Sequence, residues 1–296
     1  MGSGRRKLKG VIDIAMLQTL ANKDDIKTIT AGYDFLIVDE CHRIPTVTFE
    51  PVLKGIRVRS ILGLTATPQR KDHFQSIIFM QCGPIGYTVQ DVNKENQIRN
   101  VYFKSTDVPE LPKDGTIQDM WETLIGNKSR NKLIISDVLK LLQEEKSPLI
   151  LTDRIEHIEL FSDALQQQTD APVLVLKGGV GKKERKEIID KCKELFRKGD
   201  PFCLIATGSL IGEGFDFPDF NTMILTLPIS FRGRLTQYVG RLHRQTTEDK
   251  KTITVYDYVD ICSGMTISMF KKRIPAYKKL GYIFHYDITD KIAKWL

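Results

Sequence analysis

The sequence predicts an α/β protein made of two parallel-sheet lobes, the first of which is incomplete. Short apolar runs rich in β-branched residues alternate along the chain with helix-length amphipathic stretches, as in parallel sheets covered by crossover helices. The chain has 296 residues, enough for two domains with separate cores. Its composition of 41% hydrophobic and 27% charged residues is typical of a folded globular protein.

The first expected lobe covers residues 1–92. Strands are predicted at residues 11–15, Phe35–Val38 and 61–64, and each is followed by polar or small residues at the sheet edge where a ligand crevice forms. Because so few strands are visible, with no strand before them in the sequence, this part is expected to be the C-terminal half of a lobe.

Residues 93–148 are expected to connect the lobes. Pro109, Pro112 and Gly115 lie in a polar stretch without clear periodicity, and an amphipathic helix is predicted near residues 132–143. This pattern is typical of a linking segment rather than of a sheet.

A complete second lobe is expected over residues 149–262. Its predicted strands are residues 149–151, Val173–Leu176, 202–206, 223–227 and 252–256. Residues 263–296 are expected to form a C-terminal helical tail packed on this lobe, because Met269, Arg273 and Tyr277 recur at helical spacing.

The charge and the cysteine content limit the kinds of partner and the cellular compartment that are expected. Lys and Arg total 44 against 37 Asp and Glu, and the net charge of +7 favours a polyanionic partner. The five cysteines are far apart and form no Cys-x-x-Cys pair, which indicates a reducing compartment. No apolar run approaches the roughly 20 residues of a membrane helix. We therefore expect a cytoplasmic protein that does not span a membrane.

The most specific chemical signal is Asp39-Glu40-Cys41-His42, which directly follows the apolar run Phe35–Val38. A strand that delivers two adjacent carboxylates to the carboxyl edge of a parallel sheet can hold Mg²⁺ with one and polarise a water with the other. Hydrolysis of a nucleoside triphosphate needs both services. An acidic strand end that only caps a turn remains the alternative for the pair taken alone.

Two further segments follow predicted strands. Thr65-Ala66-Thr67-Pro68 places two hydroxyls where they can hydrogen-bond neighbouring loops, although for this segment alone a strand-to-turn transition ended by Pro68 is the favoured explanation. In the glycine-rich segment 206–216, Gly214 permits close backbone approach to a ligand and Asp216 can accept a hydrogen bond from a ribose hydroxyl. A glycine-rich loop with no fixed role is the alternative.

The fourth segment runs from Gln237 to Arg244 on a helix predicted to begin near Arg234. Arg241 and Arg244 are three residues apart, so they share a helical face and could reach the same anion. Two such guanidinium groups can act as arginine fingers on a transferring phosphoryl group. A solvated helix face is the alternative.

Taken in this order, the four segments resemble motifs II, III, V and VI of superfamily 2 helicases, with Asp39–His42 similar to the DExH box. Residues 12–20 are similar to motif Ib and residues 151–154 to motif IV, so the resemblance spans nearly the entire chain. It is greatest to the type III restriction-subunit and XPB-like helicases. The resemblance implies two RecA-like lobes that bind ATP between them.

The same resemblance implies roles for individual residues at the ATP site. Asp39 would hold Mg²⁺, Glu40 would activate the attacking water, and His42 would couple the site to Gln237, which contacts the nucleotide or its water. The remaining implied residues are Thr65 and Thr67 for coupling hydrolysis to movement, Arg241 and Arg244 for the γ-phosphate, and Gly214 and Asp216 for lining the nucleotide.

The implied partner is nucleic acid, with DNA favoured over RNA. It would cross Gln18, Arg154, Gly178, Gly179 and Thr207, and contacts of this kind go mainly to phosphates and sugars. A nuclease or restriction subunit is a further expected partner, and the oligomeric state is left open.

The chain departs from the family pattern at one point. These helicases need a G-x-x-x-x-G-K-[ST] loop whose backbone amides hold the phosphates, and no such sequence precedes Asp39. We therefore expect a truncated chain that alone binds ATP poorly and hydrolyses almost none.

Two rival functions remain open. The segment Lys177-Gly178-Gly179-Val180-Gly181-Lys182-Lys183 resembles the deviant phosphate loop of ParA-type ATPases, but Lys183 stands where a Ser or Thr must coordinate Mg²⁺. The other rival is a nucleic-acid-binding module without catalysis. The water-activating carboxylate and the paired arginines favour the helicase over the binding module, and Lys183 disfavours the ParA-type loop.

Overall fold

The computed structural model divides the chain into two compact units, Met1–Gln90 and Asp91–Leu296. The structure describes residues 8–23, 25–46, 48–65, 74–89, 97–111, 115–208, 210, 220–229, 232–243 and 252–296, with the backbone alone at 232–234 and 241. Each unit is described by itself.

The first unit contains a two-stranded parallel sheet, with β1 at Phe35–Val38 and β2 at Ser60–Gly63. Its helices are α1 (Leu17–Ala21), α2 (Ile26–Thr30), η1 (Cys41–Arg43), α3 (Phe49–Gly55) and α4 (Gln75–Cys82). Leu20, Val38, Ile44, Val52 and Ile78 form its buried core. β1 is confirmed with the predicted bounds, and β2 begins one residue earlier than predicted.

The predicted strand at residues 11–15 is wrong. No strand is assigned there, and the side chains of Val11 and Ile12 are more than 80% exposed. The Asp13 carboxylate instead accepts hydrogen bonds from the backbone N–H groups of Lys9 and Gly10 at 2.8–2.9 Å. A carboxylate that satisfies its own neighbouring backbone offers the chain an alternative to a strand ladder.

The second unit contains a seven-stranded sheet in the order β5-β6-β4-β7-β8-β3-β9, and its neighbouring strands are parallel. The strands are β3 (Ile98–Thr106), β4 (Pro148–Thr152), β5 (Val173–Leu176), β6 (Cys203–Thr207), β7 (Thr222–Leu225), β8 (Thr252–Asp260) and β9 (Ile283–His285). All five strands predicted for the second lobe are present, within three residues at their starts and ends except at the longer end of β8.

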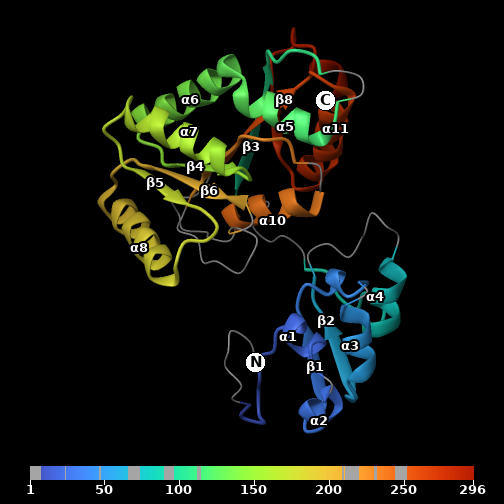
Figure 1. The fold of residues 1–296 in the computed structure, drawn as a ribbon. Coiled ribbons are helices and arrows are strands. Elements are labelled where there is room, and N and C mark those ends of the chain that lie inside the picture. Colours follow the sequence, from blue (N-terminus) through green and yellow to red (C-terminus); the bar gives the residue numbers. More distant parts are fainter. Residues whose placement is uncertain are drawn as a thin grey trace. The chain divides into compact units, whose positions relative to one another are not determined.

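Helices cover both faces of this sheet. They are α5 (Ile117–Gly126), α6 (Lys128–Gln143), α7 (Ile155–Gln166), α8 (Lys182–Lys198), α10 (Arg232–Leu242) and α11 (Gly264–Lys279), with η2 at Ala293–Trp295. Figure 1 shows α6 and α7 on one side and α8 and α10 on the other. Along β4, Leu149 and Leu151 face the α8 side while Ile150 faces α6 and α7. No described helix is long and apolar enough to cross a membrane.

The segment expected to connect the lobes contributes β3, α5 and α6 to the second unit. β3 lies inside the sheet, paired with β8 over its whole length and with β9 beyond it. The strand is hidden in the sequence because Arg99, a core-facing residue, is charged. Its guanidinium is buried and donates to the backbone carbonyl of Leu280 at 2.9 Å and to Gln97 at 3.2 Å. β9 likewise adds a strand to the tail expected to be helical.

Candidate functional site

Asp39 and Glu40 lie directly beyond the carboxyl end of β1. Asp39 is exposed, and its carboxylate accepts a hydrogen bond from the N–H of Glu40 at 2.9 Å. The backbone of Glu40 is left-handed, with φ 50° and ψ 47°, a conformation that costs a non-glycine residue ~1 kcal/mol or more. Such strain is concentrated at functional sites, and here it turns the chain sharply just after the strand.

The Glu40 carboxylate, the His42 ring and the Thr65 hydroxyl form one cluster. His42 Nδ1 lies 3.0 Å from Glu40 Oε2 and 3.0 Å from Thr65 Oγ1. The backbone holds the two strand ends together, because Leu64 N–H donates to Val38 and Cys41 N–H donates back to Leu64, both at 2.9 Å. The structure therefore brings together the segments that resemble motifs II and III, while Thr67 lies outside the described residues.

The residues at this strand end fit a Mg²⁺ ion that is held partly by other groups. Among the described residues, no cluster of three or more His, Cys, Asp or Glu side chains could hold a metal alone. Mg²⁺ is commonly bound through one or two carboxylates and keeps water and phosphate oxygens as its other ligands. The exposed carboxylate of Asp39 suits that role.

Cys41 and Cys82 belong to the apolar core of the first unit, and their sulfurs lie beside Gly63. A Cβ added to Gly63 on β2 would lie 2.9 Å from the Cys82 sulfur and 3.0 Å from the Cys41 sulfur, so this position has no room for a side chain. Burial raises the pKa of the Cys41 thiol to about 11 and also raises that of Cys82. Both thiols are therefore protonated and unreactive near neutral pH.

In the second unit, a pocket of about 290 Å³ opens at the carboxyl ends of β4, β6 and β7. Ligands bind at this edge in open parallel sheets. The pocket is lined by Ile117, Trp121, Leu151, Thr152, Asp153, Arg154, Gly208, Leu225, Leu227, Pro228, Ile229, Tyr238 and Met269. These residues come from α5, the three strand ends, α10 and α11.

Gly208 lies where the segments that resemble motifs IV, V and VI meet. A Cβ at this position would lie 1.9 Å from the Tyr238 hydroxyl oxygen on α10 and 2.8 Å from an Asp153 carboxylate oxygen beyond β4. The chain after β6 can pass between them only because residue 208 has no side chain. The three segments, distant in the sequence, are thus in contact.

The predicted nucleic-acid residues of this unit occupy the same edge. Arg154 is the N-cap of α7, and its guanidinium carbon lies 5.5 Å from the centre of the Trp121 ring. Thr207 ends β6; it is 8% exposed, and its hydroxyl has no hydrogen-bond partner among the described residues. Gly178 and Gly179 lie in the exposed loop between β5 and α8. Gln18, in the first unit, is an exposed residue of α1.

The predicted phosphate-contacting residues are described in part. Gln237 is half-buried on α10, and Arg241 belongs to the same helix, which packs on the sheet through Leu235, Tyr238 and Val239. Gly214, Asp216 and Arg244 lie outside the described residues.

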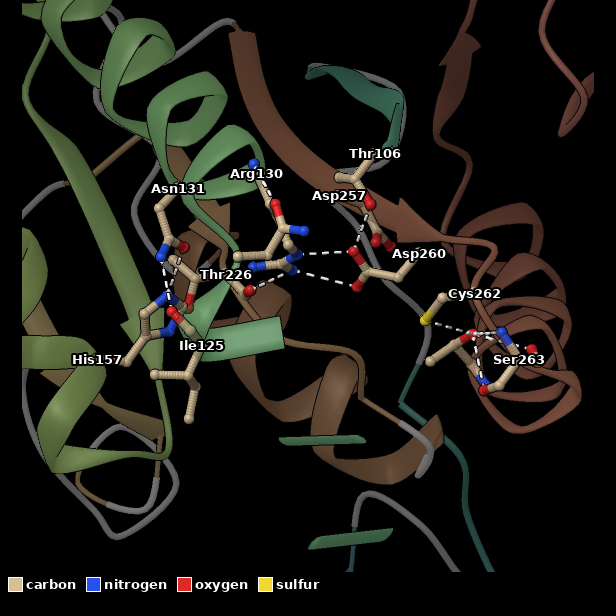
Figure 2. Close-up of polar contacts among 12 residues, drawn as sticks. Thr106, Ile125, Arg130, Asn131, His157, Thr226, Asp257, Asp260, Cys262 and Ser263 are labelled. Carbon is tan, nitrogen blue, oxygen red and sulfur yellow. Dashed lines mark hydrogen bonds and ion pairs between the residues drawn. The ribbon is translucent and has the colours of Figure 1, made fainter. Parts of the chain in front are cut away.

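A buried polar cluster anchors α6 and α7 to the sheet (Figure 2). The Arg130 guanidinium donates to Asp260 at 2.6 Å and to the carbonyl of Thr226 at 2.5 Å. His157 bridges the Thr152 hydroxyl at 3.2 Å and the Asn131 side-chain oxygen at 3.1 Å. These contacts tie both helices to the ends of β4, β7 and β8.

The sequence interpretation missed Trp121, Tyr238 and this cluster. Trp121 lies in residues 93–148, which were expected only to connect the lobes. The one feature of the sequence that could have marked it is the rarity of tryptophan, of which the chain has two. Tyr238 lay inside a recognised motif but has no charge to mark it. Buried polar residues give no sequence signal, because their partners lie far along the chain.

The loop that resembles a ParA phosphate loop is open to solvent. Gly178, Gly179 and Gly181 have no atom within 4 Å of an added Cβ. Lys183, at the position that should coordinate Mg²⁺, lies 4.0 Å from Glu187 on the first turns of α8.

Comparisons with known proteins bear on both units. The family model "Type III restriction enzyme, res subunit" matches residues 3–70, and "Helicase conserved C-terminal domain" matches residues 132–246. Together they match more than half of the chain. A protein of Acanthamoeba polyphaga mimivirus named "Putative ATP-dependent RNA helicase L396" is 26% identical over 95% of this chain and 54% of its own length. The chain belongs to the superfamily 2 helicases.

Other relatives agree with this family assignment. "Probable helicase D10" of Escherichia phage T5 is 24% identical to this helicase chain over 95% of the chain and 60% of its own length. The chain thus spans a little more than half the length of these curated relatives. The solved structure of Mss116p bound to ssRNA and AMP-PNP has the same fold, with a TM-score of 0.57, 12% identity, and coverage of 94% of this chain and 53% of that one.

Proposed function

We propose that this chain is part of the motor of an ATP-dependent helicase or translocase that acts on single-stranded nucleic acid. The observation that carries the proposal is the cluster of Glu40, His42 and Thr65 at the ends of β1 and β2, beside the exposed carboxylate of Asp39. It places the Glu40 carboxylate, which would activate the water, next to the His42 ring, whose hydrogen bonds depend on whether Glu40 is protonated. A protein that only binds nucleic acid has no use for this arrangement.

At the ATP site, each side chain has a distinct task. Asp39 holds Mg²⁺, which neutralises phosphate charge when bound. The Glu40 carboxylate orients the attacking water and accepts its proton. His42 Nδ1 lies 3.0 Å from both Glu40 and Thr65. When Glu40 gains a proton, its contact with His42 changes, and His42 transmits that change to Thr65 at the end of β2. The family resemblance assigns Thr67 to the same coupling role.

Motif residues of the second unit are proposed to contact the nucleotide. Gln237, Arg241 and Arg244 are assigned to the γ-phosphate and its water. Gly214 and Asp216 are assigned to lining the nucleotide. Half-burial of Gln237 on α10 is consistent with a side chain that is held in place while it remains accessible.

Nucleic acid is assigned to Gln18, Arg154, Gly178, Gly179 and Thr207. The net charge of +7 favours such a partner through phosphate contacts. DNA is proposed as the preferred partner over RNA, and the test below compares the two directly. The relative from mimivirus is named an RNA helicase, and Mss116p was solved with ssRNA.

The first prediction concerns Glu40. ATP hydrolysis is measured with and without single-stranded DNA or RNA, in the 296-residue chain and in a longer version that carries a phosphate-binding loop. We expect nucleic-acid-stimulated turnover in the longer version. Glu40→Gln should lower kcat by ~10²- to 10⁴-fold, because the amide cannot accept the proton. ATP affinity should change little, because the amide is isosteric with the carboxylate.

The controls separate the rival functions. Glu50→Gln, on α3, removes a surface carboxylate of the same unit that pairs with Lys54, and it should leave turnover unchanged. Nucleic-acid affinity that is independent of ATP, together with no turnover in the longer version, would show a binding module instead. Loss of ATP binding on Lys182→Ala would indicate the ParA-type loop.

A further inference from the structure

Two aromatic side chains, Trp121 and Tyr238, line the pocket at the ends of β4, β6 and β7. Trp121 is half-buried on α5 and lines the pocket beside Ile117, which is 53% exposed. On its other sides lie Pro228 and Met269. A large indole that remains partly exposed over a concave apolar surface is suited to receive a planar apolar ligand.

The position of Trp121 is fixed by the buried side of its helix. Met120 and Leu124 of α5 are fully buried against Leu227, Cys262 and Met269 in a separate core cluster. The helix begins with a capping box in which the Thr116 hydroxyl and the Asp119 carboxylate each accept a backbone N–H. The backbone position of Trp121 is therefore fixed before any ligand arrives, which reduces the entropy cost of binding. The Arg154 guanidinium lies over the Trp121 ring, so a base can stack on that face only when the guanidinium moves onto the adjoining phosphate.

One rim of the pocket is polar and charged. Arg154 lies over the Trp121 ring at 5.5 Å, and Asp153 and Thr152 precede it at the end of β4. A planar ring with an attached anionic group would place the ring on the apolar wall and the anion at the guanidinium. A nucleotide unit has this combination of groups.

We propose that this pocket binds one unstacked base of the single strand, stacked on Trp121, with the adjoining phosphate at Arg154. The inference rests on the proposed function, because it takes the strand to cross the second unit at Arg154. It adds a base contact to a set of contacts otherwise made to phosphates and sugars. Because every base has an aromatic face, the contact holds the strand without selecting its sequence.

The chain provides a direct optical test. Trp121 and Trp295 are its two tryptophans, and Trp295 packs at η2 near Phe270, Lys271 and Lys294. In the Trp295→Phe variant of the 296-residue chain, fluorescence reports Trp121 alone. Single-stranded oligonucleotides should quench it, whereas abasic oligonucleotides of the same length should bind through phosphates and leave it unquenched.

Affinity provides the second readout. Trp121→Ala should weaken oligonucleotide binding about tenfold, equivalent to ~1.4 kcal/mol, and leave abasic binding unchanged. Trp121→Phe should restore most of the affinity, because it keeps an aromatic face. Circular dichroism and thermal melting confirm that both variants are folded.

Each other outcome overturns a defined part of the inference. Oligonucleotide binding without quenching, and without an effect of Trp121→Ala, removes the base pocket and leaves nucleic-acid binding intact. Quenching by AMP at a concentration where oligonucleotides give none assigns the pocket to free nucleotides. Failure of both oligonucleotide types to bind overturns the base pocket together with nucleic-acid binding by the proposed motor.

Discussion

A single buried histidine makes the stability of the second unit depend on pH. His157 has no exposed surface, and burial, aided by the nearby Arg130 charge, lowers its pKa from 6.5 to about 3. Asn131 donates its amide to the carbonyl of Ile125, so its oxygen accepts from His157 Nε2, and Nδ1 accepts from the Thr152 hydroxyl. The neutral imidazole therefore satisfies both neighbours.

The predicted consequence is a loss of stability as the pH falls below 6.5. The unfolded state takes up a proton there while the folded state does not, so the free energy of unfolding should decrease by ~1.4 kcal/mol per pH unit from this group. His157→Gln should remove that slope between pH 6.5 and 4.5, although it lowers stability at pH 7.5. Urea unfolding at several pH values measures both effects. An unchanged slope would mean that His157 is charged in the folded state.

At the residue scale, local motifs predicted candidate residues that the structure places together, whereas packing partners could not be predicted. Asp39, Glu40 and His42 could be recognised because four consecutive positions after a strand carry the signal, and the structure brings two of them together with Thr65. Trp121 could not be recognised, because its neighbours come from residues 151 to 269 along the chain.

At the scale of elements, Gly208 joins β6, the end of β4 and α10. Gly208→Ala should destabilise the second unit by ~1–3 kcal/mol, because its methyl group would overlap the Tyr238 side chain within a packed core. The added methyl group would also press on the Asp153 carboxylate. Because Arg154, the proposed phosphate contact, directly follows Asp153, the substitution should also weaken nucleic-acid binding. Thermal melting and oligonucleotide titration measure the two effects.

A matched glycine tests the cause. Gly126, at the end of α5, has no atom within 4 Å of an added Cβ and no left-handed φ. Gly126→Ala should therefore be neutral or stabilise the protein by up to ~1 kcal/mol. In a Gly208→Ala, Tyr238→Phe double variant, part of the lost stability should return, because the atom in closest contact is the hydroxyl oxygen. Equal effects of the two glycine substitutions would contradict this account.

The elements that the sequence predicted well are those whose pattern is local. β1 and β5 are uniformly apolar runs ended by polar or glycine residues, and both were predicted with the observed bounds. β3 mixes charged and polar residues with the apolar run Val101–Phe103, and its partner β8 begins 154 residues later, so its place in the sheet depends on pairing that no local window contains. The run at 11–15 is apolar apart from Asp13, but no described strand pairs with it.

At the scale of the whole molecule, the two units differ in how well their sheets are covered. The described part of the first unit has two strands, and Phe35, Ile37 and Leu62 are 43–57% exposed. The second unit has seven strands with buried side chains on both faces. Because a two-stranded sheet is marginal in isolation, the first unit should open at a lower free energy than the second.

Hydrogen exchange should reveal this difference at matched amides. Cys41 N–H and Leu64 N–H bond to carbonyls across the β1–β2 junction at 2.9 Å, and Thr226 N–H bonds to Leu151 at 3.0 Å at the corresponding edge of the larger sheet. We expect the first two to exchange at least ~10-fold faster, because local unfolding of the smaller sheet exposes them while the larger sheet stays closed. Equal protection would show that the units unfold as one cooperative body. Faster exchange confined to the first unit would place the cluster of Glu40, His42 and Thr65 in the less stable unit, which is consistent with the proposal that this strand end changes its contacts.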